Sequence, residues 1–518
     1  MLTVRDATLR LLRSLGITTL FGNPGSTELP LFRDFPSDFR YVLGLQESVV
    51  VGMADGFAQA TRNAAMVNLH SSAGTGHSLG NVFAAFKNQT PLIITAGQQA
   101  RSILPFEPFL FADRPTEFPR PFIKWASEPA LAKDVPRAIA RAYYEAMTPP
   151  CGPTFVSIPI DDWDAEGEEV VTRKIATTNP GDPEAVATLA RALLQSEKPA
   201  LVLGAGVARD RAWDALVQLA ERQRAAVYVA PFASRNVFPE SHALFRGFLA
   251  AHRGALVEAL RAHDLIVSFG GPMNLYHTEG SGPHVPPQSE CWCVGDNPAH
   301  LSWAPAGSGI LANTRCVAEQ LVKLTGVSQR AAPESRPPPA GLDPAVLNDR
   351  LLMARIGACM PENAIVVEEA PSSRPAMQEY LKLNRPDSFH TTAGGGLGHS
   401  LPAAVGVALG SKGRRVVAIL GDGSAMYSIQ GLYAAARLRV PITFVIVNNR
   451  RYEGLEIFGR LFGIEQPVGT DLQGLDFCLL ARGHGVPATL VTRAEDLDTQ
   501  LTQAFASEGP SLVEVRVV

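Results

Sequence analysis

A strand–helix–strand pattern in the last third of the chain constrains the fold most strongly. Residues 416–420 form a short, apolar, β-branched run that is typical of a buried strand, and it ends at the sequence Gly-Asp-Gly-Ser of residues 421–424. A helix is expected over roughly residues 427–438, before a second buried strand at 442–447 that ends at the Asn-Asn pair of residues 448–449. A unit of two parallel strands joined by a helix binds ligands at the carboxyl ends of its strands.

The polar residues that follow these two strands suit a metal ion and a phosphate group. Asp422 and Asn449 are expected to be neighbours, because the carboxyl ends of parallel strands share one edge of a sheet. Gly423 lets the backbone approach a ligand closely, and the amino end of the following helix favours phosphate. A carboxylate and a carboxamide oxygen in such a place suit Mg²⁺, which shares its other positions with phosphate oxygens and water. Gly-Asp-Gly alone is a common turn, but the second strand and the Asn pair argue against chance.

Length and composition describe a soluble enzyme of several domains. With 518 residues, the chain is too long for one core and fits about three domains. Its net charge of −4 gives no indication of a nucleic acid or an anionic membrane as partner. No apolar run is long enough to span a bilayer, and residues 1–22 lack the features of a signal peptide. The six scattered cysteines are expected to be buried free thiols, so we predict a cytoplasmic protein.

Alternating helical and strand-like stretches predict an α/β fold of three doubly wound parallel-sheet domains. Two linkers rich in proline separate these domains, one at residues 179–183 and one at 328–344. We therefore expect domains at residues 1–180, 181–340 and 341–518.

Three loops of the first domain carry residues suited to chemistry. Ser26, Glu47 and His70 each follow a predicted strand, so all three should open on the same edge of one sheet. Glu47 precedes the apolar run 48–53, and a carboxyl group in apolar surroundings resists ionisation and can share a proton. Taken singly, each residue also has a structural interpretation: a turn serine, an acid at a helix amino end and a core histidine. The loop 104–120, rich in Pro and Phe, is expected to form a wall over an active site.

The middle domain gives weaker indications. Gly204-Ala205-Gly206 resembles a dinucleotide-binding turn, but the third glycine of that fingerprint and a convincing acidic partner are missing. A vestigial or structural role is therefore favoured over a bound nucleotide. His277 follows a strand predicted at residues 266–271.

With its Gly-Asp-Gly and Asn-Asn motifs, the chain resembles the thiamine diphosphate-dependent 2-keto acid decarboxylases along nearly its whole length, and among these the benzoylformate decarboxylase type. The resemblance implies pyrimidine-binding, central and diphosphate-binding domains, with thiamine diphosphate and Mg²⁺ as cofactors and Ca²⁺ as a possible substitute for the metal. It implies non-oxidative decarboxylation of an aryl 2-keto acid, such as benzoylformate to benzaldehyde and CO₂ in mandelate breakdown. It also implies a homo-oligomer, usually a dimer of dimers, with active sites at the subunit interface.

The same resemblance assigns roles to individual residues. Glu47 matches the glutamate that hydrogen-bonds the cofactor's aminopyrimidine ring, and Ser26 matches the serine that binds the substrate carboxylate. His70 and His277 match the two histidines that handle protons. Cofactor contacts are expected from Ser372, Gly395, Leu397, Asp422, Gly423, Ser424, Asn449 and Tyr452. The metal ligands would be Asp422, Asn449 and the backbone carbonyl of Arg451. The substrate pocket would be lined by Phe109, Leu110, Thr391, Gly454, Leu455 and Phe458.

Some pocket positions depart from the family pattern. Thr391 stands where a phenylalanine is expected, Gly454 replaces an alanine, and Phe109 replaces a leucine. The reaction class is therefore better defined than the natural substrate. Other interpretations are a decarboxylase of different specificity, a carboligase that joins two aldehydes, an acetolactate synthase-like enzyme, and a non-catalytic protein that binds the cofactor. The acetolactate synthase type would need a flavin site in the middle domain, which the sequence does not indicate.

Overall fold

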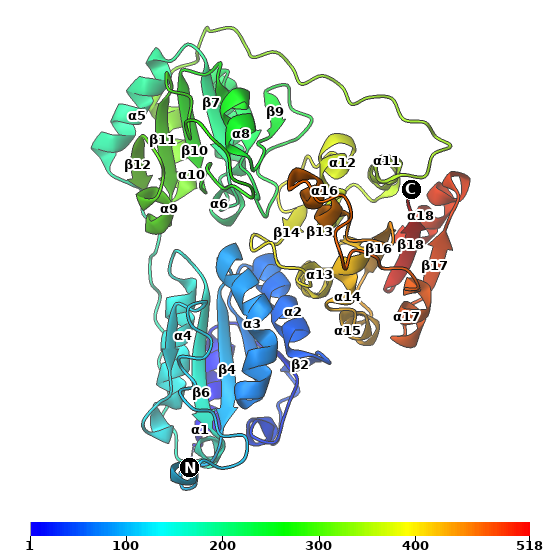
Figure 1. Cartoon of the computed structure of the whole chain (residues 1–518). Coiled ribbons are helices and arrows are strands. Elements are labelled where there is room, and N and C mark those ends of the chain that lie inside the picture. Colours follow the sequence, from blue (N-terminus) through cyan, green and yellow to red (C-terminus); the bar gives the residue numbers. More distant parts are fainter. Residues whose placement is uncertain (1) are drawn as a thin grey trace. The chain divides into compact units, whose positions relative to one another are not determined.

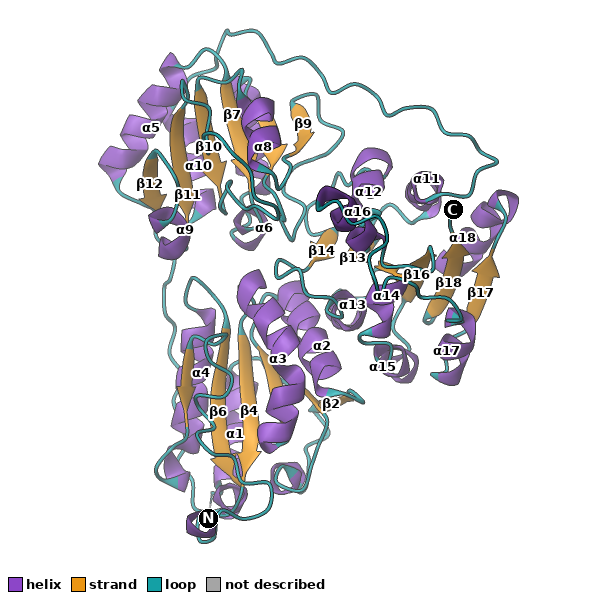
Figure 2. Cartoon of the chain, in the orientation of Figure 1, coloured by secondary structure: helices purple, strands orange, loops and turns teal. Residues whose placement is uncertain are grey.

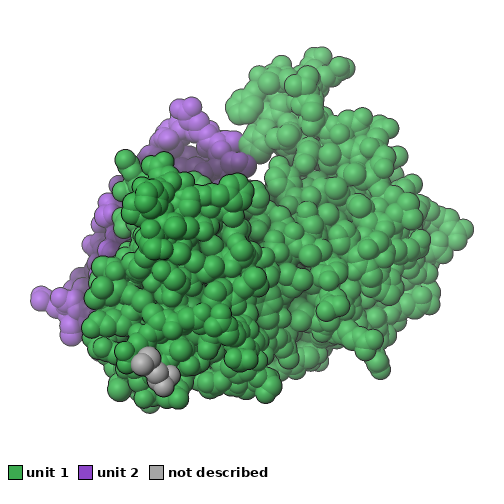
Figure 3. All heavy atoms as spheres, turned by 90° about the horizontal axis from the view of Figure 1, so that it is seen from below, with its two compact units in different colours: residues 1–175, 343–374, 394–518 green, residues 176–342, 375–393 purple. Residues whose placement is uncertain are grey.

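The computed structural model describes residues 2–518, which form three six-stranded sheets with helices beside their strands (Figure 1 and Figure 2). The chain folds into two compact units (Figure 3). One unit comprises the residues up to 175 together with 343–374 and 394–518, and the other comprises 176–342 and 375–393. This arrangement confirms the predicted fold class of doubly wound α/β domains with parallel sheets.

The first sheet has the strand order β2-β1-β3-β4-β6-β5, and all of its neighbouring strands run parallel. Its strands are short, mostly apolar runs bounded by turn residues, as is typical of strands in a parallel sheet. The strands are β1 (Thr19–Gly22), β2 (Arg40–Leu43), β3 (Ala65–Leu69), β4 (Leu92–Gln98), β5 (Trp125–Ser127) and β6 (Pro153–Pro159). The helices are α1 (Val4–Ser14), α2 (Glu47–Thr61), α3 (Ser71–Asn88) and α4 (Val135–Met147).

The second sheet, which lies wholly in residues 176–342, has the order β12-β11-β10-β7-β8-β9. Its central strands β7 and β10 are fully buried apolar runs, as expected for a parallel sheet covered on both faces. The strands are β7 (Pro199–Leu203), β8 (Ala226–Val229), β9 (Phe245–Phe248), β10 (Leu265–Phe269), β11 (Glu290–Gly295) and β12 (Ser308–Leu311). The helices are α5 (Pro183–Gln195), α6 (Gly206–Arg209), α7 (Trp213–Gln223), α8 (Arg253–Leu260), α9 (Pro298–Ser302) and α10 (Thr314–Leu324).

The third sheet has the order β14-β13-β15-β16-β18-β17 and contains the predicted cofactor motif. Its strands are β13 (Ile365–Glu369), β14 (Phe389–Thr391), β15 (Val416–Gly421), β16 (Ile442–Asn448), β17 (Ala488–Val491) and β18 (Ser511–Arg516). The helices are α11 (Asp349–Cys359), α12 (Arg374–Tyr380), α13 (Ser400–Gly410), α14 (Asp422–Met426), α15 (Gly431–Leu438), α16 (Glu453–Leu461), α17 (Phe477–Gly483) and α18 (Leu497–Phe505).

The prediction of a helix at residues 427–438 was wrong at the helix's amino end. A short helix, α14, begins at Asp422 directly after β15, and the chain then turns before α15 begins at Gly431. In this turn Tyr427 and Ser428 donate backbone hydrogen bonds to residues three positions earlier, so the tighter geometry interrupts the helix. Asp422 therefore lies in the first turn of a helix, where a negative charge is stabilised.

The first sheet and strands β13 and β15–β18 of the third share one hydrophobic core, which explains why they form one unit, whereas β14 belongs to the other unit. Helices α2 and α13 cross in this core with their backbones in contact. A Cβ atom at Gly56 would lie 2.0 Å from the carbonyl oxygen of Ala403, and one at Gly406 would lie 1.9 Å from that of Met53. Only glycine permits this approach at the two positions.

Two expectations from composition can be compared with the structure. Within residues 2–518, no helix combines the length and the apolar character needed to cross a bilayer. All six cysteines are free, as predicted, but only Cys291 and Cys478 are buried. The other four are half-buried: Cys293, Cys316 and Cys359 lie on partly covered strands and helices, and Cys151 lies in the loop before β6.

Candidate active site

Glu47 is the first residue of α2 and lies at the edge of the first sheet where β1, β2 and β3 end. The residue is 8% exposed, in agreement with the prediction of a buried carboxyl group. Its surroundings are more polar than the sequence indicated, because the Asn23 side-chain amide donates to Oε1 at 3.1 Å and His77 Nδ1 lies 3.1 Å from Oε2. Both carboxylate oxygens are thus held by side chains from neighbouring loops and helices.

His70 precedes α3 and forms a second polar contact at the same edge. Its Nδ1 atom lies 2.9 Å from Glu28 Oε2 and 3.1 Å from Thr27 Oγ1. Glu28 is 1% exposed, and its Oε2 atom also accepts a hydrogen bond of 2.8 Å from the backbone N–H of Gly25. A buried carboxylate on one imidazole nitrogen fixes the ring and leaves Nε2 for chemistry.

Two glycines make room for this histidine–glutamate pair. A Cβ atom at Gly25 would lie 2.1 Å from His70 Nδ1, and one at Gly97 would lie 2.0 Å from Glu28 Oε1. Larger residues at either position would displace the imidazole or the carboxylate. The pair is therefore packed directly against the backbone of the first loop and of β4.

The sequence indicated Ser26, Glu47 and His70 but not Glu28 or His77. Ser26 lies in the same loop as Thr27 and Glu28, where its side chain is exposed. Gly74 of α3 lies between the other two residues, since a Cβ atom there would be 3.4 Å from Glu47 Cγ and 3.5 Å from His70 Cβ. The loop after β1, the start of α2 and the residue before α3 thus bring Ser26, Glu47 and His70 to one edge of the sheet, as expected.

His277 belongs to the other compact unit, and its catalytic role stays a prediction. It is exposed, donates its backbone N–H to the carbonyl oxygen of Ala251, and has its ring edge-on to Phe232. Thr391, predicted to line the substrate pocket, is in the same unit, where it is buried at the end of β14 and donates its backbone N–H to the carbonyl oxygen of Ser234.

The predicted metal ligands lie at the carboxyl ends of β15 and β16, which are paired. Asp422 is 4% exposed, and its two carboxylate oxygens accept 2.7 Å hydrogen bonds from the backbone N–H groups of Gly423 and Arg450. Burial raises the pKa of the Asp422 carboxyl above the ordinary value for aspartate, although these backbone N–H groups act in the opposite direction. A cation beside the buried carboxylate would stabilise its charged form, so the donor set fits Mg²⁺.

The structure distinguishes the two residues of the Asn-Asn pair. Asn448 is buried, and its side-chain amide donates to the carboxylate of Glu514 at 2.8 Å, which is a structural role. Asn449 is less buried, with its amide 2.8 Å from Glu453 Oε2 and its Oδ1 atom accepting from the backbone N–H of Arg451. The guanidinium of Arg451 turns to acidic side chains on α16, so a metal would meet only its backbone carbonyl.

The loop before α13 contains the residues predicted to hold the aminopyrimidine ring. Gly395 is exposed with a φ of +71°, and no atom lies within 4 Å of the position of a Cβ. The end of the loop is anchored by the buried carboxylate of Glu369, which accepts backbone hydrogen bonds from residues 398–400 at 2.6–3.0 Å. The Asn81 amide donates to the carbonyl oxygens of Ser48, at 2.7 Å, and Gly398, at 3.3 Å. Neither Glu369 nor Asn81 was indicated by the sequence, because both act only through contacts with distant segments.

The remaining predicted cofactor and pocket residues lie around these sites. Ser424 is buried in α14, Ser372 follows β13 and Leu397 is half-buried in the loop before α13. Tyr452 packs closely on α14, since a Cβ atom at Gly423 would lie 2.1 Å from its ring. Leu110 lies half-buried in the loop 104–120, where its carbonyl oxygen accepts from Ser71 Oγ, while Phe109 is 89% exposed. Gly454, Leu455 and Phe458 lie in the first turns of α16.

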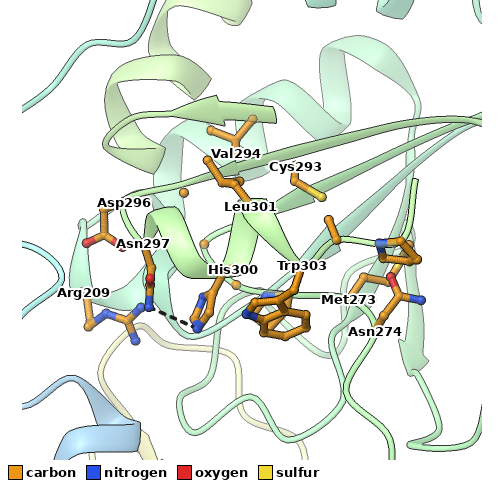
Figure 4. A pocket seen from close by; sticks show the side chains of 16 residues that line it. Arg209, Met273, Asn274, Cys293, Val294, Asp296, Asn297, His300, Leu301 and Trp303 are labelled. Atoms are coloured by element: carbon orange, nitrogen blue, oxygen red, sulfur yellow. Dashed lines mark hydrogen bonds between the residues drawn. The ribbon is translucent and has the colours of Figure 1, made fainter. Parts of the chain in front are cut away.

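The glycine turn of the middle domain has a structural role. Gly206 donates its backbone N–H to the carbonyl oxygen of Gly270 at 2.6 Å, and a Cβ atom at Gly206 would lie 2.6 Å from Gly270 Cα. A small pocket lies beside this contact, lined among others by Arg209, Asp296, Asn297, His300 and Trp303 (Figure 4). The glycines thus allow two loops to pack together, and the pocket contains none of the predicted site residues.

Comparisons with known proteins identify the family of the chain. Three domains of thiamine pyrophosphate enzymes match the sequence: the N-terminal TPP binding domain at residues 2–112, the central domain at 186–321 and the C-terminal TPP binding domain at 372–515. The chain is 41% identical to benzoylformate decarboxylase from Pseudomonas aeruginosa over 99% of both chains.

Solved structures with high similarity include two enzymes of related specificity. Benzoylformate decarboxylase from Polynucleobacter necessarius superposes with a TM-score of 0.98 and 39% identity, covering 100% of this chain and 99% of that one. The 4-hydroxybenzoylformate decarboxylase from Rhodococcus jostii RHA1 has a TM-score of 0.96 and 38% identity, with 99% of each chain covered.

Proposed function

This chain is a member of the thiamine pyrophosphate enzyme family, and from that premise we propose that it decarboxylates an aryl 2-keto acid to the aldehyde and CO₂. The observation that carries the proposal is the juxtaposition of Glu47 with the His70–Glu28 pair at one sheet edge. The two enzymes of similar fold act on benzoylformate and 4-hydroxybenzoylformate, so these two acids are the first candidate substrates.

Thiamine diphosphate and Mg²⁺ fit the residues of the third sheet. Asp422, Asn449 and the carbonyl oxygen of Arg451 would hold the metal, and Ser372, Gly423 and Ser424 would bind the diphosphate. Gly395, Leu397 and Tyr452 would contact the organic part of the cofactor. When bound, thiamine diphosphate supplies a nucleophilic carbon and an electron sink for the departing CO₂. The protein must bind, orient and handle protons.

The proton-handling groups follow from the contacts at the first sheet. Glu47 is held at both oxygens and would exchange a proton with the cofactor's aminopyrimidine ring. Glu28 fixes the His70 ring, so that its free nitrogen can give or take a proton near the substrate. We propose that Ser26 binds the substrate carboxylate and that His277 is the second proton-handling histidine. We also propose that Phe109, Leu110, Thr391, Gly454, Leu455 and Phe458 line the pocket for the aryl group.

We further propose that the working enzyme is a cytoplasmic homo-oligomer, with a dimer as its smallest active form and a dimer of dimers as its final state. Support comes from large apolar side chains that are exposed in the single chain. Phe106 and Phe109 are 80% and 89% exposed in the loop before β5, and Leu461 and Phe462 are 66% and 72% exposed at the end of α16. Apolar side chains that gather in one exposed patch are typical of a surface that another protein covers. We also propose that the boundaries between the three domains lie near residues 180 and 340.

The test is a substrate panel with the purified protein, thiamine diphosphate and Mg²⁺. We expect benzoylformate or 4-hydroxybenzoylformate to give its aldehyde, and aliphatic 2-keto acids to react more slowly. Acyloin products from mixed aldehydes without CO₂ release would identify a carboligase, and acetolactate from pyruvate would identify an acetolactate synthase. Bound cofactor without turnover of any 2-keto acid would contradict the proposal and indicate a binding protein.

A further inference from the structure

His77 is in direct contact with Glu47, the glutamate on which the proposed reaction depends. Its Nδ1 atom lies 3.1 Å from Glu47 Oε2, while Asn23 bonds the other oxygen. The side chain of Glu47 is only 11% exposed, whereas that of His77 is 65% exposed. The imidazole therefore lies between a buried carboxylate and the solvent.

The position of His77 follows from the face that α3 turns toward α2. Residues 70, 74, 77 and 81 are spaced by four, three and four positions, so they lie on one side of this helix. Gly74 lets the Glu47 side chain pack against the helix, and Asn81 donates to the carbonyl oxygen of Ser48. Gln46 also donates its side-chain amide to the carbonyl oxygen of His77 at 3.3 Å. The start of α2 is thus fixed along the face from which His77 projects.

We propose that His77 is a positioning residue that holds the Glu47 carboxylate and connects it to the protons of the solvent. The proposal rests on the proposed function, because it takes Glu47 to be the group that exchanges a proton with thiamine diphosphate. Of the other titratable groups at this edge, His70 and Glu28 bond to each other, and the Tyr41 hydroxyl is buried near Glu28. Among the described residues, His77 is the titratable side chain that contacts Glu47.

Proton transfer through the ring balances over a full cycle. A neutral His77 that carries its proton on Nε2 accepts the Glu47 proton at Nδ1, so the Oε2–H bond breaks as the Nδ1–H bond forms. Loss of the Nε2 proton to water leaves a ring protonated on Nδ1, which donates a hydrogen bond to the carboxylate. In the return direction, water protonates Nε2 and the Nδ1 proton passes to Oε2, which restores the starting form.

The first measurement uses the protein without cofactor. Histidine labelled with ¹³C at Cε1 gives one NMR signal for each ring, and the signal missing from His77→Asn identifies His77. We expect the chemical shift of this ring signal, compared at one fixed pH, to change in Glu47→Gln, because Nδ1 loses its carboxylate partner. An unchanged signal would overturn the contact on which the proposal depends, whatever the catalytic activity.

The second measurement follows hydrogen–deuterium exchange at C2 of bound thiamine diphosphate as a function of pH. Asn at position 77 keeps a hydrogen-bond donor but cannot carry a proton, so we expect cofactor affinity to be retained and exchange to slow by about tenfold or more. The pH dependence between about 5 and 8, where histidine titrates, should also be lost. His242→Asn is the matched control, since His242 makes a similar contact of 3.2 Å with Glu221 in the middle domain.

The outcomes separate the two proposals. Wild-type protein that fails to accelerate the exchange over free cofactor would contradict the proposed function itself. Acceleration in the wild type, with the same rate and pH profile in His77→Asn, would overturn only the role of His77.

Discussion

At the scale of single residues, the contact between Glu28 and His70 explains how one loop can prepare a histidine for proton transfer. Glu28 is buried, accepts from the backbone of Gly25, and lies 2.9 Å from the imidazole. A carboxylate on Nδ1 fixes the orientation of the ring, so that Nε2 is available to give or take a proton. The glycines at positions 25 and 97 keep this pair in close contact with the backbone.

We expect Glu28→Gln to lower kcat by roughly tenfold to a hundredfold, because the amide keeps the shape of the side chain but removes the carboxylate that fixes the His70 ring. Steady-state kinetics of the wild type and the variant, with matched thermal unfolding curves, measure the effect. Glu221→Gln is the control, since it removes the carboxylate from an exposed histidine contact in the middle domain. Equal kcat values in the wild type and Glu28→Gln would contradict this role.

The metal site allows a second test at this scale. Chelation of the metal should abolish activity and release thiamine diphosphate, and Mg²⁺ or Ca²⁺ should restore both, because the cofactor's phosphates are held through the ion. Asp422→Asn should weaken cofactor binding even at saturating Mg²⁺, as read by equilibrium dialysis. Activity that survives complete removal of divalent ions, checked by elemental analysis, would contradict the assignment.

Residue-level prediction from sequence worked where a motif fixes both residue type and spacing. Asp422 and Asn449 were recognised because the two strands that carry them are apolar runs, and the structure pairs those strands as expected. Glu28 and His77 were not recognised, because their roles depend on contacts across loops and helices that no spacing rule contains. The break between α14 and α15 was also missed. The residues between the two helices suit both α-helical hydrogen bonds and the tighter bonds to residues three positions earlier, so the sequence does not distinguish these patterns.

At the scale of helices, a buried ion pair joins α2 and α13. His399 Nε2 lies 2.6 Å from Asp55 Oδ2, and both side chains are buried. Burial alone would lower the pKa of His399, but the charge of Asp55 and the hydrogen bond to it raise that pKa above its ordinary value. Burial would likewise raise the pKa of Asp55, but His399 lowers it. The pair therefore consists of a carboxylate and an imidazolium, between the helix that begins at Glu47 and the helix that follows the glycine-rich loop.

Removal of the imidazole should be costly, because it leaves the buried Asp55 carboxylate without its charged partner and with neutral contacts such as the amides of Gln59 and Asn88. We expect His399→Ala to lower the free energy of unfolding by about 3–5 kcal/mol. A double-mutant cycle with Asp55→Asn, followed by chemical denaturation, should show strong coupling. Additive effects of the two changes would contradict the pairing.

The pH dependence of stability follows from the same pKa directions. The raised pKa of His399 contributes stability that is complete below about pH 6.5 and is lost as pH rises through the folded-state pKa. The lowered pKa of Asp55 contributes stability that is complete above about pH 3.9 and is lost as pH falls through its folded-state pKa. The difference between wild type and His399→Ala should therefore be largest between about pH 4 and 6.5 and shrink at higher pH. A difference that grows as pH rises would contradict the ion pair.

The crossing of α2 and α13 should also be sensitive to added volume. A methyl group at Gly406 would meet the backbone of Met53, which cannot move as a side chain can, so we expect Gly406→Ala to destabilise the protein by about 1–3 kcal/mol. Gly483→Ala is the control, because a Cβ there meets no atom within 4 Å. Equal losses of unfolding free energy in both variants would show that the close contact is not the cause.

At the scale of the whole molecule, the sequence predicted the three parallel sheets because their buried strands are short apolar runs separated by helical stretches. It could not show that the first sheet and strands β13 and β15–β18 of the third share one core, since the glycines at the α2–α13 crossing look like ordinary helix residues in sequence. The exposed apolar side chains in the loop 104–120 and at the end of α16 are the surfaces on which we expect a second copy to dock.

We expect sedimentation velocity to report a dimer or a tetramer. Leu461→Arg combined with Phe462→Glu should shift the population toward smaller species, because charges replace two exposed apolar side chains. Val468→Glu is the control, since Val468 is also highly exposed but lies beyond α16. A wild-type monomer with full activity would contradict the oligomeric proposal.

Reconstitution of the cofactor-free protein, with benzoylformate or 4-hydroxybenzoylformate as substrate, is the decisive test of the proposed decarboxylation. We expect no product without thiamine diphosphate and Mg²⁺, then equal amounts of aldehyde and CO₂ when both are added, and almost none from reconstituted Glu47→Gln. CO₂ release that is independent of the cofactor, or unchanged in Glu47→Gln, would contradict the proposed reaction.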